Sequence, residues 1–302
     1  MPTIESLNKQ FTETDGVHFC LAKDLYPKQG GDIPFLVVEN RLAKAAIALQ
    51  GAHITSFKPR GKSDVLWISP KSNFEAGKPI RGGIPLCLPW FSAHPSGQDF
   101  PMHGFARITE WTVASISGLP DGGTLVSLTL ADSKETLVSW PHAFQFRLNI
   151  TIGKKLTLGL TVENKSAEPA KLTFAWHTYF NVGDVAAIRV EGLEDCPYID
   201  KLDKMAKKTQ DGALVFRAAT DSVYSDVPTV QTIHSPVGTW RIEGSGKNAI
   251  AWNAWTNDAN IADIGEGNHK GYVCIERGDV LDHAVTIRAK GNYHNNMIIS
   301  AI

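Results

Sequence analysis

Features that would assign this chain to several common protein classes are scarce. The sequence contains only four cysteines, which are widely spread and form no CxxC or Cys/His grouping of the kind that holds zinc. We therefore expect them to be reduced residues of the core. They are Cys20, Cys87, Cys196 and Cys274.

Motifs for metals and nucleotides are also missing. The ten histidines form no HxH or HExxH grouping, which argues against a metal site. Glycine-rich stretches such as 244–246 and 265–267 lack the GxxxxGK[ST] and GxGxxG arrangements, so we interpret them as turns. We expect neither a metal nor a nucleotide cofactor.

The chain has almost no excess of charge of either sign. Thirty basic and 31 acidic residues give a net charge of −1, so no overall field favours nucleic acid or an anionic membrane as a partner. An anionic small ligand would need local arginines. The polar, acidic segment 1–16 lacks the apolar run of about 7 to 15 residues that a secretory signal requires. No later stretch approaches the roughly 20 apolar residues of a membrane span. We expect a cytoplasmic protein.

Short segments in which apolar and polar residues alternate recur along the chain. This period of two predicts antiparallel strands, and turn signals at 120–123 and 153–154 separate some of them. Helical periodicity is not sustained anywhere, and its nearest case, 200–207, is too short for a helical domain. With no linker to divide the chain, we predict an all-β protein, a large antiparallel β-sandwich formed by residues 1–302 as one domain. The alternating segments are 45–59, 123–132, 144–152, 155–164, 171–180 and 283–291.

Strand alternation singles out two residues of the acid/base type. In LTFAWHTYF (172–180), His177 lies on the face opposite the most apolar row of side chains. In YVCIERG (272–278), Glu276 likewise lies opposite two branched aliphatic residues. Alternatively, His177 is a half-buried strand histidine bonded to a backbone carbonyl.

A dense turn region holds further polar candidates. The segments RGGIPLCLPWF (81–91) and PMHGFAR (101–107) are rich in glycine and proline, and such turns commonly display ligand-binding groups. Arg81, His103 and Arg107 could converge there on an anion. Alternatively, this is an irregular edge connection whose arginines are solvated, paired with carboxylates or bonded to loop carbonyls.

These two segments resemble the signature of the aldose 1-epimerase superfamily, in its hexose-6-phosphate mutarotase branch. The resemblance continues in order over nearly the whole chain, and the ordered combination is far more specific than any one motif. The further segments are FAWHTYF (174–180), GLEDCPYIDK (192–201), DSVY (221–224), AWNAW (251–255) and VCIE (273–276).

The resemblance implies a monomeric sandwich of the galactose mutarotase type that acts on phosphorylated hexoses without a metal or nucleotide. It assigns His177 as general acid and Glu276 as general base, and it places Arg81, Arg107 and Asp221 at substrate-binding positions. His103 would hydrogen-bond a sugar hydroxyl or hold its loop. Some relatives have glutamine before the His-Gly pair, where this chain has Met102, which affects one polar sugar contact.

The chemistry of anomer exchange asks for the same residue types. A base takes the proton of the O1 hydroxyl while an acid protonates the ring oxygen, and the opened sugar closes again after rotation about C1–C2. On this scheme His177 starts protonated and Glu276 ionised, with Asp221 as a possible support for the imidazolium. The competing hypotheses are a mutarotase of neutral aldoses and a non-catalytic protein that binds sugar phosphates. For Glu276 the competing role is an ion pair with Arg277 or Arg241.

Overall fold

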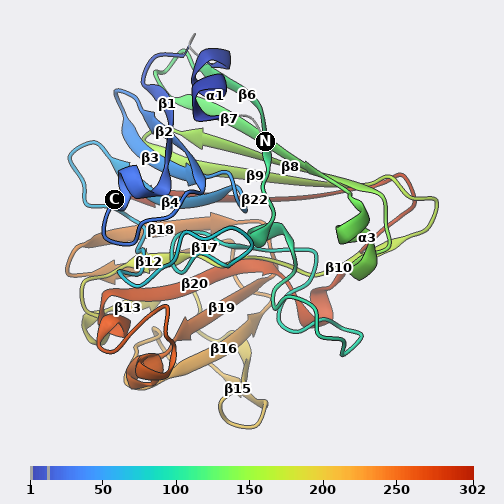
Figure 1. The fold of residues 1–302 in the computed structure, drawn as a ribbon. Helices are drawn as coiled ribbons and strands as arrows, with labels where there is room; N and C mark the ends of the chain where they lie inside the picture. The colour runs from blue at the N-terminus through green and yellow to red at the C-terminus, as the bar shows by residue number, and fades with distance from the viewer. Residues whose placement is uncertain (1–2, 12–13) are drawn as a thin grey trace.

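The computed structural model describes residues 3–11 and 14–302, and its architecture is a two-layer antiparallel β-sandwich (Figure 1). Two eight-stranded sheets pack face to face, and a four-stranded sheet formed by the N-terminal part of the chain packs against their common core. The predicted all-β sandwich is confirmed.

The sheet that carries the candidate site is called the site sheet. Its strand order is β15-β14-β16-β19-β20-β11-β5, and β12 also pairs with β20. Its strands are β5 (Leu86–Cys87), β11 (Phe174–Trp176), β12 (Tyr179–Asn181), β14 (Pro197–Asp200), β15 (Ala206–Thr209), β16 (Thr220–Ser225), β19 (Asn248–Asn253) and β20 (Tyr272–Asp279).

The second large sheet, called the back sheet, has the order β13-β17-β18-β22-β9-β8-β7-β6. Its strands are β6 (Thr112–Gly118), β7 (Thr124–Ala131), β8 (Phe144–Ile152), β9 (Lys155–Asn164), β13 (Arg189–Glu191), β17 (Val230–Ser235), β18 (Gly238–Gly244) and β22 (Asn292–Ala301).

The other elements are short. The four-stranded sheet contains β1 (Val17–Leu21), β2 (Pro34–Glu39), β3 (Ala43–Ala48) and β4 (His53–Pro59), and β10 (Ala170–Leu172) pairs with β21 (Val285–Ile287). The helices are α1 (Ile4–Gln10), α2 (Ala22–Leu25), α3 (Lys134–Ser139), η1 (Ala106–Ile108), η2 (Val185–Ala187), η3 (Trp255–Asn260), η4 (Asn268–Gly271) and η5 (Leu281–His283).

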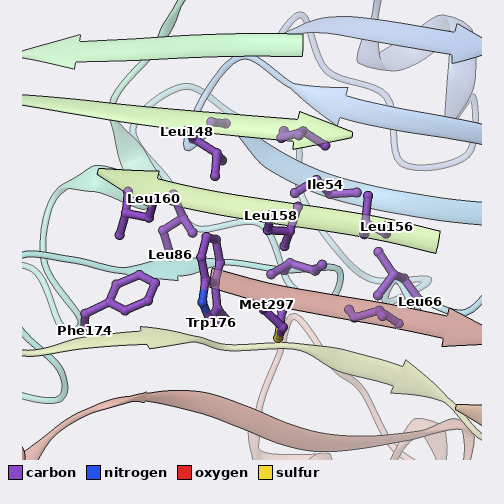
Figure 2. Packing of buried hydrophobic residues seen from close by; sticks show 14 of the residues in the cluster. Ile54, Leu66, Leu86, Leu148, Leu156, Leu158, Leu160, Phe174, Trp176 and Met297 are labelled. Carbon is purple, nitrogen blue, oxygen red and sulfur yellow. The ribbon is translucent and has the colours of Figure 1, made fainter. Parts of the chain in front are cut away.

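Alternation along the strands builds the core between the two sheets. In β9 every second residue from Leu156 onward is buried, and Leu156, Leu158 and Leu160 belong to the same core cluster as Phe174 and Trp176 of the site sheet (Figure 2). The indole N–H of Trp176 would be costly to bury without a partner, and it donates to the side-chain oxygen of Asn295 at 2.8 Å. The apolar row opposite His177 is therefore core.

Strand β20 is buried on both of its faces. All eight of its residues are buried, with Val273 and Ile275 in the core between the sheets. Gly278 lets β11 approach closely, because a Cβ atom there would lie 2.0 Å from the carbonyl oxygen of Phe174. This approach keeps β20 and β11 in register, with Trp176 opposite Arg277.

Two sequence expectations differ from the structure in detail. The expected continuous strand 171–180 is divided into β10, β11 and β12, with breaks at Thr173 and at His177 and Thr178. The segment 200–207, noted for weak helical periodicity, is the end of β14, a turn and the start of β15. The sequence pattern does not predict the short helices α1 and α3, because each is less than two turns long.

Arg277 is a buried cation whose hydrogen bonds connect several segments. Nη1 donates to the carbonyl of Pro228 at 2.9 Å and to the side chain of Gln231 at 2.6 Å, and Nη2 donates to the carbonyls of Gly244 at 3.0 Å and Gly246 at 2.5 Å. Burial lowers the pKa of Arg277 to about 10. These bonds hold the strand that carries Glu276.

We expect Arg277→Met to lower the free energy of unfolding by about 2 to 5 kcal/mol, because several buried acceptors lose their donor. Urea denaturation followed by circular dichroism measures the change. Arg241→Met is the matched control, since this more exposed arginine pairs with Glu243, and its loss should cost less than about 1 kcal/mol. Equal effects of the two substitutions would refute the structural role of Arg277.

Candidate active site

The turn that carries His177 is held by the glycine- and proline-rich segment 81–91. The backbone N–H of His177 donates to the carbonyl of Pro85 at 3.0 Å, and that of Tyr179 donates to the carbonyl of Gly83 at 2.9 Å. Gly83 has a positive φ of 63°, and a Cβ atom there would lie 2.3 Å from the carbonyl of Ile54. Glycine is therefore required for this segment to reach the His177 turn.

His177 and Glu276 lie side by side. Nε2 of His177 is 3.4 Å from Oε1 of Glu276, and the two residues are only 8% and 1% exposed. Among the described residues, Nδ1 of His177 and Oε2 of Glu276 have no hydrogen-bond partner. The alternative of a histidine side chain bonded to a backbone carbonyl is thus not what the structure shows.

The alternative ion pairs of Glu276 are not formed either. Arg277 follows it on β20 and turns its guanidinium toward carbonyls near β18, and Arg241 pairs with Glu243. The carboxylate instead lies beside His177 on the other face of the site sheet.

Burial shifts both groups of this pair toward their uncharged forms. Desolvation raises the pKa of Glu276 well above its usual value, and the negative charge of Asp221 adds to the effect. Desolvation also lowers the pKa of His177 well below its usual value, assisted by His103 and Arg107. Burial therefore opposes the two charged forms, an imidazolium at His177 and a carboxylate at Glu276, that the sequence-based scheme assigns to the start of the reaction.

His103 contacts His177 from a strained turn. Its φ of 64° is in the left-handed region, and its ring centroid lies 5.7 Å from that of His177. The backbone N–H of Ser92 donates to Nδ1 at 3.1 Å. Burial, with the positive charges of Arg107 and other cations, lowers the pKa of His103 to about 3. A neutral ring that accepts at Nδ1 must carry its proton on Nε2, which makes His103 a hydrogen-bond donor.

Arg81 is connected to the catalytic candidates through Tyr179. Its Nη1 donates to the Tyr179 hydroxyl at 2.9 Å, and the Tyr179 ring stacks on His177 with centroids 5.0 Å apart. Its Nε donates to the carboxylate of Asp263 at 3.1 Å. Burial acts to lower the pKa of Arg81, but Tyr179 and Asp263 outweigh it and raise the pKa.

Arg107 is a cation for which the described residues supply only a carbonyl. Nη2 donates to the backbone oxygen of Met102 at 2.8 Å, and Nε is buried without a partner there. Burial lowers the pKa of Arg107, and the charge of Arg81 acts in the same direction. The side chain of Met102 is exposed, so this departure from some relatives lies at the rim.

Asp221 belongs to an ion pair that the sequence does not reveal. Its Oδ2 lies 2.7 Å from Nζ of Lys201, and the backbone N–H of Lys201 donates to the Asp221 carbonyl at 2.9 Å. The negative charge of Asp221 raises the pKa of Glu276, whereas Lys201 lowers it. Asp221 thus acts on the pKa of the Glu276 carboxyl group, and its support of an imidazolium stays a prediction.

Two apolar regions flank the pair along the same face of the site sheet. Toward Arg81 an aromatic cluster includes Tyr179, Tyr272 and the half-buried Trp252, whose ring lies 6.1 Å from that of His177. Toward the other end, a pocket of about 360 Å³ is lined in part by Phe91 and Lys201. His53 is fully buried, and its Nε2 bonds the backbone carbonyl of Gly82 at 2.7 Å, as expected of a structural residue.

The geometry suits proton transfer to and from groups attached to a single atom of a ligand. A carboxyl group and an imidazole stand in contact, a second imidazole offers an N–H group, and two guanidinium groups lie nearby. Within residues 3–11 and 14–302, no three His, Cys, Asp or Glu side chains form a group that could hold a metal ion.

Comparison with known proteins identifies the family of this chain. The family model for aldose 1-epimerases matches residues 34–300. The chain belongs to the aldose 1-epimerase family. As a member of this family it is an isomerase that binds a sugar substrate.

Individual members of the aldose 1-epimerase family are similar to this chain over most of their length. A protein of Escherichia coli K12, provisionally named glucose-6-phosphate 1-epimerase, is 37% identical over 251 residues, covering 81% of this chain and 83% of the relative. A protein of Cenchrus ciliaris with the same provisional name is 34% identical over 271 residues, covering 85% and 81%. A crystal structure from Salmonella typhimurium, provisionally named a mutarotase, has a TM-score of 0.87 at 29% identity and covers 98% of both chains.

The structure brings all six residues predicted from the sequence into one region of this epimerase fold. His177, His103 and Glu276 are linked by contact or close approach, while Arg81, Arg107 and Asp221 act on them electrostatically. Sequence reasoning missed Lys201, Tyr179 and Asp263. The order YIDK before DSVY was visible, but only the pairing of β14 with β16 brings Lys201 to Asp221.

Regarding the membrane, the part of the chain that the structure describes contains no helix with both the length and the apolar character needed to span a bilayer.

The charges flanking Glu276 should shift its pKa in opposite directions. Asp221→Asn removes a negative charge and should lower the pKa of Glu276, whereas Lys201→Met removes a positive charge and should raise it. Carbon-13 NMR of the glutamate carboxyl carbons, assigned with Glu276→Gln, measures both shifts. Shifts of the same sign in the two variants would contradict this electrostatic arrangement.

Proposed function

We propose that this aldose 1-epimerase family member interconverts the α and β anomers of a hexose 6-phosphate, with glucose 6-phosphate as the principal candidate. The observation that carries the proposal is the contact between His177 and Glu276, 3.4 Å apart in a buried site. The names of the relatives from E. coli and C. ciliaris support the substrate class.

Adjacent acid and base groups suit the anomeric centre. The O1 hydroxyl and the ring oxygen are both bonded to C1, so neighbouring side chains can reach the two oxygens at once. Glu276 takes the proton from O1 while His177 gives one to the ring oxygen, and the reverse transfers close the ring after rotation about C1–C2. No covalent enzyme intermediate is required.

Throughout this cycle His177 and Glu276 share one titratable proton, which is on either the imidazole or the carboxyl group. Ring opening begins with an imidazolium and a carboxylate and ends with the neutral pair, and burial shifts the pKa of each group toward its neutral form. Attraction between the two charges at contact distance offsets part of the cost of forming the ion pair. Transfer of the shared proton from Glu276 to His177 therefore prepares the site for the closed sugar.

The phosphate is assigned to Arg81 and Arg107. A guanidinium group can make two charge-assisted hydrogen bonds to phosphate oxygens. Carboxylates already accompany Arg81 and Lys201, but the described residues provide no carboxylate in contact with Arg107. A bound phosphate would supply that missing negative charge. His103 and Asp221 are then assigned to sugar hydroxyl groups as donor and acceptor.

We also infer the setting in which the enzyme works. One core cluster includes residues of the four-stranded sheet and both large sheets, which supports a single domain over residues 1–302. We assign the enzyme to the cytoplasm as a monomer whose partner is a small hexose phosphate, without nucleic acid, membrane or cofactor.

His177→Asn and Glu276→Gln should each reduce anomer exchange of glucose 6-phosphate by about 10²- to 10⁴-fold, because each removes one proton-transfer group. Magnetisation-exchange NMR of the two anomers measures the rate directly. The matched controls are His18→Asn on β1 and Glu163→Gln on β9, which change the same residue types away from the candidate site and should retain full activity. Absence of acceleration by the wild-type protein would rule out the proposed function.

Arg81→Ala should raise the KM for glucose 6-phosphate by about 10- to 100-fold, since it removes charge-assisted hydrogen bonds to the phosphate. Neutral glucose, which has no phosphate to lose, should show a much smaller change. Exchange rates for the two sugars over a range of concentrations provide the comparison. Equal losses for both sugars would favour a mutarotase of neutral aldoses.

A further inference from the structure

The arginine assigned to the phosphate is already partly occupied by a carboxylate of the protein. Nε of Arg81 donates to Asp263 at 3.1 Å and Nη1 donates to Tyr179 at 2.9 Å. A guanidinium carries five N–H groups. Those that remain on Nη1 and Nη2 make no hydrogen bond to any residue in 3–11 and 14–302, so a ligand could share the guanidinium with Asp263.

We propose that Asp263 sets the anion affinity of this subsite as a built-in competitor of the phosphate group. Its carboxylate binds Arg81 in the empty enzyme and turns away, or remains as a nearby like charge, when a phosphate arrives. This inference rests on the proposed assignment of Arg81 to the phosphate and identifies Asp263 as a specificity-determining residue.

The backbone around Asp263 is fixed while its side chain has room to move. The N–H groups of Ile264 and Gly265 both donate to the carbonyl of Ile261 at 2.9 Å, and Ile264 is fully buried in the aromatic cluster. The side chain of Asp263 is 32% exposed. It can therefore rotate toward solvent without unfolding its turn.

The side chain of Arg81 is less free to move than that of Asp263. The backbone N–H of Arg81 donates to the Ser72 hydroxyl at 2.9 Å, and its carbonyl accepts from Ser69 at 3.1 Å. The bond to Tyr179 holds one end of the guanidinium. When Asp263 turns away, Arg81 stays in the site and its Nε becomes available to the ligand.

This competition has different consequences for a sugar phosphate and for free phosphate. A like charge beside the subsite weakens the binding of every anion. A hexose phosphate also has its sugar contacts near His177 and Glu276, whereas inorganic phosphate depends on the arginines alone. Asp263 therefore keeps inorganic phosphate from occupying the site while the substrate still binds.

Calorimetric titration with inorganic phosphate tests this inference without any turnover. Asp263→Asn should bind phosphate about 3- to 10-fold more tightly than the wild type, as expected when a competing, partly exposed ion pair is removed. Combining it with Arg81→Ala should abolish the gain. The matched control is Glu191→Gln, which neutralises an exposed carboxylate paired with Arg189 on β13 and should leave phosphate affinity unchanged.

Kinetics provide a readout that a purely structural role of Asp263 would not move. In Asp263→Asn the KM for glucose 6-phosphate should fall by a factor similar to that for phosphate binding, with kcat within about twofold and the KM for neutral glucose unchanged. Asp263→Ser should change the KM values in the same way, which excludes a specific effect of the asparagine amide. Thermal denaturation checks that both variants are folded.

Unchanged or weaker phosphate binding by both folded variants would overturn the inference. The outcome is separable from that of the proposed function, because phosphate binding needs no catalysis. A wild type without anomer exchange, combined with tighter phosphate binding by Asp263→Asn, would reject the function and retain the anion subsite. Anomer exchange by the wild type, without tighter phosphate binding by Asp263→Asn, would retain the function and reject the inference about Asp263.

Discussion

The proposed active site depends on the alternation of side chains along β20, which places the consecutive residues Glu276 and Arg277 on opposite faces of the site sheet. Arg277 is buried among carbonyl groups near the back sheet, and Glu276 is buried beside His177. A shift of one residue in the pairing with β11 or β19 would exchange the two faces. The hydrogen bonds of Arg277 oppose such a shift, since they satisfy the cation only in the observed register.

Charge balance around the pair supports the proposed anionic ligand. Lys201 and Arg81 each have a carboxylate partner, Asp221 and Asp263, whereas Arg107 is bonded to a carbonyl. A partly buried guanidinium without a counter-charge is costly. The proposed phosphate would supply this counter-charge beside the acid/base pair.

Sequence patterns could predict the fold because period-two alternation reports directly which strand face is buried. The same alternation placed His177 and Glu276 on the faces opposite the core, but it could not bring together residues 99 positions apart in the sequence. Their contact follows from the pairing of β11 and β12 with β20. The contact of Arg81 with Asp263, 182 residues away, left no local signal, since a turn aspartate has many ordinary roles. Protonation was the least predictable property, because burial rather than residue type determines it.

The segment from Arg81 to Pro85 has a geometric consequence for the ligand. Arg81 begins this segment, and the carbonyls of Gly83 and Pro85 hold the turn that presents His177. The proposed phosphate group and the reacting carbon are therefore positioned by one short stretch of chain whose glycines leave no space for added side chains. On the proposed assignment, this segment fixes the distance between the phosphate subsite and the acid/base pair, which would favour a sugar whose charged end and anomeric end match that distance over one that is a carbon shorter or longer.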